Sequence, residues 1–131
     1  IFAHPIEVRF RDCDSMGHVN NAVYLTYLEQ ARLTLWRRLW GFGPDASPGT
    51  PSAILARAEI DFRIAARFGD TLEVRISVAA IGNTSFTYDY EVVDGRERLM
   101  ASGRTVQVMY DYAAAKPVPI PDQIRQKLQG I

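Results

Sequence analysis

The strongest constraint on the fold is a change of hydrophobic period near residue 50. Between Ala22 and Trp40, apolar side chains recur at spacings of three and four, which is the period of an amphipathic α-helix. From Ser52 onward the period is two, which indicates strands that bury one face. The chain is therefore predicted to pack one long helix on one face of an antiparallel sheet, because this arrangement buries both patterns.

The predicted helix has an unusually wide apolar surface. Its stripe is formed by Tyr24, Leu28, Ala31, Leu35 and Leu39, and it is widened by Leu25, Trp36 and Trp40. A stripe of more than half the circumference is expected of a central helix wrapped by a sheet. Asn20 or Asn21 is a plausible N-cap, Gly41 is expected to end the helix, and residues 43–51 have the composition of a loop.

Five strands are predicted around this helix. The first covers residues 5–11, with Ile6, Val8 and Phe10 on one face. The second begins at Ser52 and places alternate residues on one apolar face, namely Ile54, Ala56, Ala58, Ile60, Phe62 and Ile64. The others cover about 71–78, 85–92 and 98–110 and are joined by short turns, and a short helix is expected over 122–129. The opposite faces of the strands are polar, so we expect that side of the sheet to be solvated.

Composition and charge exclude several classes of protein. The 131 residues suit one domain, and the 15 basic and 15 acidic residues cancel, which argues against a nucleic-acid partner. No apolar run reaches the roughly 18 residues of a membrane span, so no stable membrane anchor is expected. Cys13 has no partner for an internal disulfide, and with only His4 and His18 available no metal site is expected. A cytoplasmic location fits this use of cysteine.

Two blocks of sequence resemble a known family. The first contains DCD at 12–14, GHVNN at 17–21, Tyr24-Leu25 and LEQAR at 28–32, and the second contains AEIDF at 58–62 followed by ARFGDTL at 66–72. Together they resemble the hotdog-fold acyl-CoA thioesterases, and more narrowly the 4-hydroxybenzoyl-CoA thioesterase-like group. The resemblance extends over essentially the whole chain.

The resemblance implies an α+β hotdog fold, in which a five-stranded antiparallel sheet wraps around the long helix, and a single domain over 1–131. It also implies a homodimer or homotetramer with active sites near the start of the helix, at the subunit interface. The implied activity is hydrolysis of an acyl-CoA thioester to CoA and a carboxylic acid. No metal or cofactor is implied, since CoA enters as part of the substrate.

The catalytic roles are carried over residue by residue. Asp14 matches the aspartate that carries catalysis in the 4-hydroxybenzoyl-CoA type, and it would act as a nucleophile or as a base for water. The backbone N–H of Asn21 is the expected oxyanion donor, because the first N–H groups of a helix have no internal partner. His18 is expected to polarise the thioester carbonyl or to be a hydrogen-bonded turn residue.

Six further residues are candidates for substrate contact. They are Gly17, Val19, Asn20, Tyr24, Arg63 and Arg67. Gly17 allows a positive φ and close approach of the backbone to a ligand, whereas Asn20 and Tyr24 have the competing roles of helix cap and core residue. The two arginines would meet CoA phosphates or remain solvated strand residues.

Other polar and aromatic residues receive structural roles. Asp12 is expected to accept turn N–H groups, and Glu29 is expected to pair with Arg32 on the helix surface. Cys13 lies between two acids that disfavour its thiolate, so it is not proposed as a nucleophile. Phe86, Tyr88 and Tyr90 are assigned to the sheet core, with the lining of an acyl pocket as the alternative.

Two other functions remain open from the sequence. A non-catalytic acyl-CoA sensor would keep the pocket without turnover, but binding alone does not require the negative charge of Asp14 beside a thioester. A hotdog hydratase or dehydratase would need His18 placed opposite Asp14 across the substrate.

Overall fold

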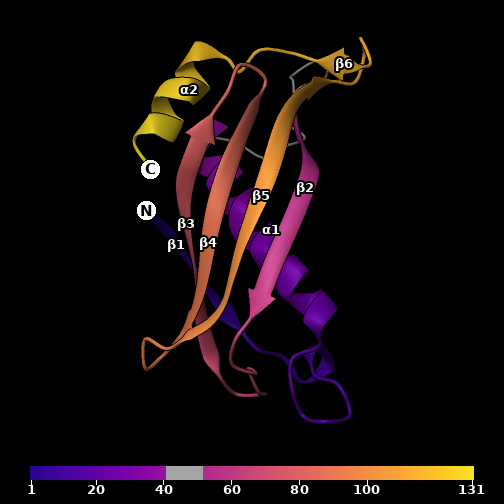
Figure 1. The fold of residues 1–131 in the computed structure, drawn as a ribbon, viewed down its shortest axis with the longest axis vertical. Coiled ribbons are helices and arrows are strands. Elements are labelled where there is room, and N and C mark those ends of the chain that lie inside the picture. Colours follow the sequence, from indigo (N-terminus) through magenta and orange to yellow (C-terminus); the bar gives the residue numbers. More distant parts are fainter. Residues whose placement is uncertain (41–51) are drawn as a thin grey trace.

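The computed structural model describes residues 1–40 and 52–131, and it shows one long helix held in the curve of a sheet (Figure 1). The predicted helix end at Gly41 and the predicted loop over 43–51 lie outside the described residues. The elements in chain order are β1 (Phe2–Glu7), the 3₁₀ turn η1 (Phe10–Asp12), α1 (Asn21–Trp40), β2 (Ser52–Phe62), β3 (Thr71–Ile81), β4 (Ser85–Asp94), β5 (Leu99–Asp111), β6 (Lys116–Pro117) and α2 (Asp122–Gln129).

The sheet has the strand order β1-β3-β4-β5-β2, and every described pair is antiparallel. This confirms the predicted α+β architecture. The sheet has six strands rather than the expected five, because the two-residue β6 pairs with the end of β5. A two-residue strand is too short to show alternation in the sequence.

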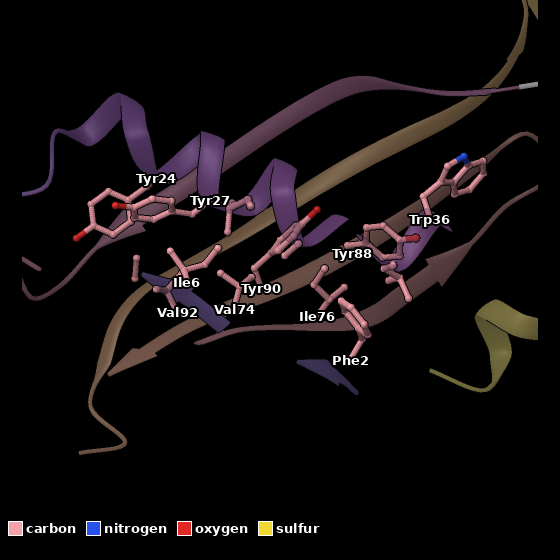
Figure 2. Close-up of a cluster of buried hydrophobic side chains, with 14 of the residues drawn as sticks. Phe2, Ile6, Tyr24, Tyr27, Trp36, Val74, Ile76, Tyr88, Tyr90 and Val92 are labelled. Carbon is pink, nitrogen blue, oxygen red and sulfur yellow. The ribbon is translucent and has the colours of Figure 1, made fainter. Parts of the chain in front are cut away.

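Helix α1 buries the predicted stripe against the concave face of the sheet. Ala31 and Leu35 have no exposed surface, and Tyr24, Leu28 and Leu39 are buried with them. Figure 2 shows Tyr24, Tyr27 and Trp36 of α1 facing side chains of β1, β3 and β4. Leu25 was expected to widen the stripe, but 44% of it is exposed, because the sheet covers one side of the helix and ends at the edge strand β2.

The apolar face predicted for the second strand is wrong at its start. A β-bulge between Leu55 and Arg57 inserts Ala56 into β2, and each extra residue reverses which face the following side chains occupy. Ile54 pairs with Val108 and therefore lies on the outer side of the sheet. The helix-facing side carries Ala53, Leu55, Ala58, Ile60 and Phe62, which pair with residues on the inner face of β5.

The first strand lies closer to the N-terminus than predicted, since it begins at Phe2 and not at Pro5. It ends at Glu7, Ile6 and Val8 are buried as expected, and 78% of Phe10 is exposed in η1. The Asp12 N–H donates to the Arg9 carbonyl at 3.0 Å and the Arg9 N–H donates to the Asp12 carboxylate at 3.0 Å. These two bonds close a turn and prevent the strand from continuing. The apolar alternation of the sequence therefore extends past the end of the strand, to Phe10.

Candidate active site

The segment between β1 and α1 forms a compact turn that begins with the buried Asp12. The carboxylate of Asp12 accepts hydrogen bonds from the Tyr27 hydroxyl at 2.8 Å, the Arg9 N–H at 3.0 Å and the Arg9 guanidinium at 3.0 Å. Burial raises the pKa of Asp12, but the hydrogen bonds from Arg9 and Tyr27 outweigh it and hold the pKa below its usual value. Asp12 therefore has the predicted structural role and anchors the turn to the helix.

The Asp14 side chain organises the same turn while keeping one oxygen free. Its Oδ1 accepts the N–H groups of Met16 at 2.9 Å and His18 at 3.3 Å. Its backbone N–H donates to the His18 carbonyl at 2.8 Å, and Gly17 follows with a φ of 78° that suits glycine. Asp14 is exposed, and within residues 1–40 and 52–131 no donor contacts its Oδ2. One carboxylate oxygen thus holds the turn and the other is available to a ligand.

The first residues of α1 show which N–H groups remain free. Asn20 is the N-cap, since its Oδ1 accepts the Ala22 N–H at 2.9 Å and its carbonyl accepts the Val23 N–H at 2.9 Å. The Asn21 N–H has no acceptor in the described part of the chain. The first turn of α1 also contains no acidic residue, so its positive dipole end is not neutralised there.

A cavity of about 300 Å³ brings these groups together at the start of α1. Its lining includes six of the nine predicted site residues, namely Asp14, His18, Val19, Asn21, Tyr24 and Arg63. The remaining lining residues are Met16, Phe62, Ile64 and Ala65. In Figure 1 the loop before α1 lies beside the end of β2, which explains how residues 40 positions apart share one cavity.

Three predicted site residues do not line this cavity. Gly17 shapes the turn, Asn20 caps the helix, and the Arg67 N–H donates to the Asp70 carboxylate at 2.9 Å. Four lining residues were not predicted from the sequence, namely Met16, Phe62, Ile64 and Ala65. The AEIDF block ends at Phe62 and was the one available signal for the last three of them.

The segment after β2 is tied to the turn by backbone bonds and by one tyrosine. Val19 donates its N–H to the Ala66 carbonyl at 2.8 Å, and His18 and Arg67 form an isolated bridge. The Tyr24 hydroxyl accepts the Ala66 N–H at 3.2 Å, and burial raises the pKa of this hydroxyl. Tyr24 therefore lines the cavity and also fixes its opposite wall.

A Tyr24→Phe variant tests this positioning role. Loss of the hydroxyl leaves the buried Ala66 N–H without its acceptor, so we expect the free energy of unfolding to fall by about 1–2 kcal/mol in a urea titration. Tyr112→Phe removes the same atom from a side chain that is 68% exposed, and it is expected to leave the stability unchanged. Equal stability of both variants would contradict the role given to Tyr24.

The helix glutamate does not form the predicted ion pair. Among the ion pairs of the described residues none joins Glu29 to Arg32. Arg32 instead donates to the hydroxyl of Tyr90 on the inner strand β4 at 3.4 Å. Glu29 and Arg32 line a different cavity, farther along α1.

A larger cavity lies on the outer face of the sheet. It measures about 440 Å³ and is lined by charged side chains, including Glu59, Asp61, Arg75, Asp89 and Arg104. Several of these are engaged with each other, as in the Arg104–Asp89 ion pair at 2.6 Å. The hollow contains no residue of the Asp14 turn, so the cavity at the start of α1 remains the better site for chemistry. Within the described residues, no helix has the length and apolar character to cross a membrane.

Comparison with known proteins gives a consistent result. The pattern of the Thioesterase-like superfamily matches residues 8–128. The acyl-CoA thioesterase YbgC of Haemophilus influenzae is 29% identical over 126 residues, which cover 95% of this chain and 91% of that protein. The 1,4-dihydroxy-2-naphthoyl-CoA hydrolase of Synechococcus elongatus is 27% identical over 126 residues, which cover 93% of this chain and 90% of that protein. The solved structure of a predicted thioesterase from Bacillus stearothermophilus superposes on this chain with a TM-score of 0.88 at 31% identity. The superposition covers 98% of this chain and 94% of that protein.

Proposed function

The chain belongs to the Thioesterase-like superfamily and is a hotdog-fold thioester hydrolase, and on this basis we propose that it hydrolyses acyl-CoA with Asp14 as the catalytic carboxylate. The class of activity is therefore thioester hydrolysis, and not acyl-CoA sensing or the hydratase or dehydratase reaction. The observation that carries the proposal is that Asp14, whose Oδ2 is free, and Asn21, whose N–H is free, line the same cavity in the described part of the chain.

The proposed reaction uses these two groups in complementary ways. The Asp14 carboxylate either attacks the thioester carbon to give a mixed anhydride, which water then hydrolyses, or removes a proton from the attacking water. In both routes the carbonyl oxygen becomes an oxyanion that accepts the Asn21 N–H at the positive end of α1. The carbon–sulfur bond then breaks, and the CoA sulfur leaves as a thiolate and takes up a proton.

Other cavity residues are assigned to substrate binding in this proposal. His18 is half-buried beside Asp14 and would hold the carbonyl or the water. Neither Arg63 nor Arg67 forms an ion pair within the described residues, but Arg63 alone of the two lines the cavity, so its guanidinium is the better candidate for a CoA phosphate. The proposed chemistry uses no metal and no cofactor, because CoA arrives with the substrate. We propose that residues 1–131 act as one catalytic domain.

A homo-oligomer is also part of the proposal. Strand β2 is an edge of the sheet, and the exposed fractions of Leu55, Phe62 and Ile64 on or just after it are 48%, 46% and 39%. An exposed apolar edge strand favours pairing with another strand. Because Phe62 also lines the catalytic cavity, a partner on this edge would lie next to the substrate.

The test of the proposal is release of free thiol from a panel of acyl-CoAs. The panel contains short, long and aromatic acyl groups, since one relative is an acyl-CoA thioesterase and another is a 1,4-dihydroxy-2-naphthoyl-CoA hydrolase. We expect turnover of at least one substrate with stoichiometric release of acid and CoA. Binding of acyl-CoA without any turnover would contradict the proposal.

A further inference from the structure

Two buried tyrosines of α1 hold the two walls of the candidate active-site cavity. Tyr24 and Tyr27 are three residues apart and project from the same side of the helix, with ring centroids 6.0 Å apart. Only 2% and 3% of their surfaces are exposed. In Figure 2 both hydroxyls point toward the start of α1. Each hydroxyl is bonded to a different segment of the chain, and the two segments carry different groups of the site.

The Tyr27 hydroxyl holds the wall that carries Asp14. It donates to the Asp12 carboxylate at 2.8 Å. The segment 12–20 folds back on itself as a short antiparallel ladder, since the Asp14 N–H donates to the His18 carbonyl at 2.8 Å and an isolated bridge lies beside this bond. Asp12 and Asp14 therefore belong to one unit, the 12–20 ladder.

The 12–20 ladder is attached to α1 at two points. The chain itself joins the ladder to the helix at Asn21, and Tyr27 holds Asp12 from a position six residues farther along, which corresponds to a rise of about 9 Å. A segment attached at one point is able to rotate about that point, whereas a second attachment fixes its orientation. The second attachment therefore sets where the Asp14 carboxylate lies relative to the Asn21 N–H.

The Tyr24 hydroxyl holds the opposite wall of the cavity. It accepts the Ala66 N–H at 3.2 Å, and the Tyr24 ring meets the Phe62 ring edge to face with centroids 5.3 Å apart. Arg63, which the proposed function assigns to a CoA phosphate, lies between these two contact points in the sequence and lines the cavity. The catalytic carboxylate does not belong to this wall.

We propose that Tyr27 and Tyr24 are positioning residues with separate tasks in the reaction. Tyr27, through Asp12, aligns the Asp14 carboxylate with the oxyanion donor, and it therefore acts on the chemical step. Tyr24 holds the wall that contacts the acyl-CoA, and it therefore acts on substrate binding. Tyr27 does not line the cavity, so its effect passes through the 12–20 ladder alone. The inference rests on the proposed function.

The first test compares two variants that lose the same atom from the same helix. Tyr27→Phe and Tyr24→Phe each remove one buried hydroxyl that forms one hydrogen bond, so a general loss of stability affects both alike. We expect kcat to fall about 10–100-fold in Tyr27→Phe with KM within about twofold of the parent chain, since a misplaced catalytic group lowers the rate and not the binding. In Tyr24→Phe we expect KM to rise about tenfold with a smaller change in kcat. The same pattern of kcat and KM in both variants would overturn the separate tasks.

An Asp12→Asn variant tests whether Tyr27 acts through its hydrogen bond. The Tyr27 hydroxyl and the Arg9 N–H both donate to Oδ2 of Asp12, so one amide oxygen keeps both bonds while the negative charge is lost. We expect Asp12→Asn to retain more of the parent kcat than Tyr27→Phe does. A greater loss of kcat in Asp12→Asn would show that the charge of Asp12 acts on the site, and it would overturn the role of Tyr27.

Amide hydrogen exchange gives a readout that does not depend on turnover. The Met16 N–H donates to the Asp14 carboxylate, whereas the Val19 N–H donates to the opposite wall. We expect the Met16 N–H to exchange about tenfold faster in Tyr27→Phe, and the Val19 N–H to do so in Tyr24→Phe. Equal Met16 exchange rates in the two variants would overturn the attachment through Tyr27.

The combined results separate the inference from the function on which it rests. If the parent chain hydrolyses no acyl-CoA, the proposed function fails and the two kinetic tasks fail with it, whatever the exchange pattern. If the parent chain hydrolyses acyl-CoA while the two variants change kcat and KM alike, the inference fails and the proposed function is intact. The exposed control Tyr112→Phe is expected to match the parent chain in both measurements.

Discussion

An Asp14→Asn variant is expected to hydrolyse acyl-CoA about 10²–10⁴-fold more slowly than the parent chain, which is the usual effect of removing a positioned acid or base. Asparagine keeps the side-chain oxygen that accepts the N–H groups of Met16 and His18, so the turn is expected to persist. What is lost is the negative charge of a carboxylate that lines the cavity. The measurement is the initial rate of thiol release over a range of acyl-CoA concentrations.

The matched control for this experiment is Asp111→Asn. Asp111 also accepts two backbone N–H groups through its Oδ1, from Ala113 at 2.9 Å and Ala114 at 3.2 Å, but it lies outside the cavity. We expect its activity to match the parent chain. Full activity in Asp14→Asn would transfer the chemistry to His18 in the same cavity or to Glu29, which lines the cavity farther along α1.

Removal of the buried Asp12 carboxylate is expected to cause the largest loss of stability. In Asp12→Ala the Tyr27 hydroxyl, in a residue that is 3% exposed, loses its acceptor, and the Arg9 N–H loses its partner in the turn. Hydrogen bonds to a buried charged group are strong, and we expect the free energy of unfolding to fall by about 2–4 kcal/mol. The measurement is urea denaturation followed by circular dichroism.

Two further variants separate the buried network from ordinary surface charge. Tyr27→Phe removes one of the donors to Asp12 and is expected to lower the stability by about 1–2 kcal/mol. Asp89→Ala removes a carboxylate that pairs with Arg104 at the surface, and little change is expected. Equal losses in Asp12→Ala and Asp89→Ala would contradict the anchoring role of Asp12.

The Asp12 contribution also has a defined pH dependence. Its pKa in the folded chain is lowered, so the folded state binds the proton less readily than the unfolded state, whose pKa is about 3.9. The contribution is therefore complete well above pH 4 and is lost as the pH falls through the folded pKa. The stability difference between the parent chain and Asp12→Ala is expected to shrink in urea titrations between pH 5 and pH 2. A difference that is constant over this range would show that Asp12 acts through its size alone.

Local pattern was sufficient to predict most of the secondary structure. The predicted helix start at Ala22 differs by one residue from the observed start at Asn21, and the terminal helix over 122–129 has the predicted bounds. The errors lie where a bulge or a hydrogen-bonded turn interrupts a segment whose hydrophobic alternation is regular. The bulge at Ala56 exchanges the faces of β2, and the Asp12 network ends β1 before Phe10, although the apolar alternation continues through both places.

The site was predictable only in part for a similar reason. Asp14, His18 and Asn21 are close in sequence, and the turn and the helix start bring them to one cavity by local geometry. Phe62 comes from the far end of β2 and Ala65 from the segment after it. The cavity farther along α1 depends on how Trp36, Leu55 and Tyr88 meet across three elements. No spacing along the chain encodes these contacts.

The sequence by itself determined the family, the order of helix and strands, and the turn that holds Asp14. These depend on residue type and on spacings of a few residues, which local backbone geometry converts directly into structure. Only the tertiary structure decided which Asp14 oxygen is free, that Asn20 is occupied as a cap while the Asn21 N–H is not, and that the Tyr88 hydroxyl is buried without a partner. Each of these is a question of which donor meets which acceptor. The Asp14 and Asn20 bonds join residues two to four positions apart, and the folded backbone selects them among several local alternatives. The surroundings of Tyr88 depend on packing between segments that are distant in sequence.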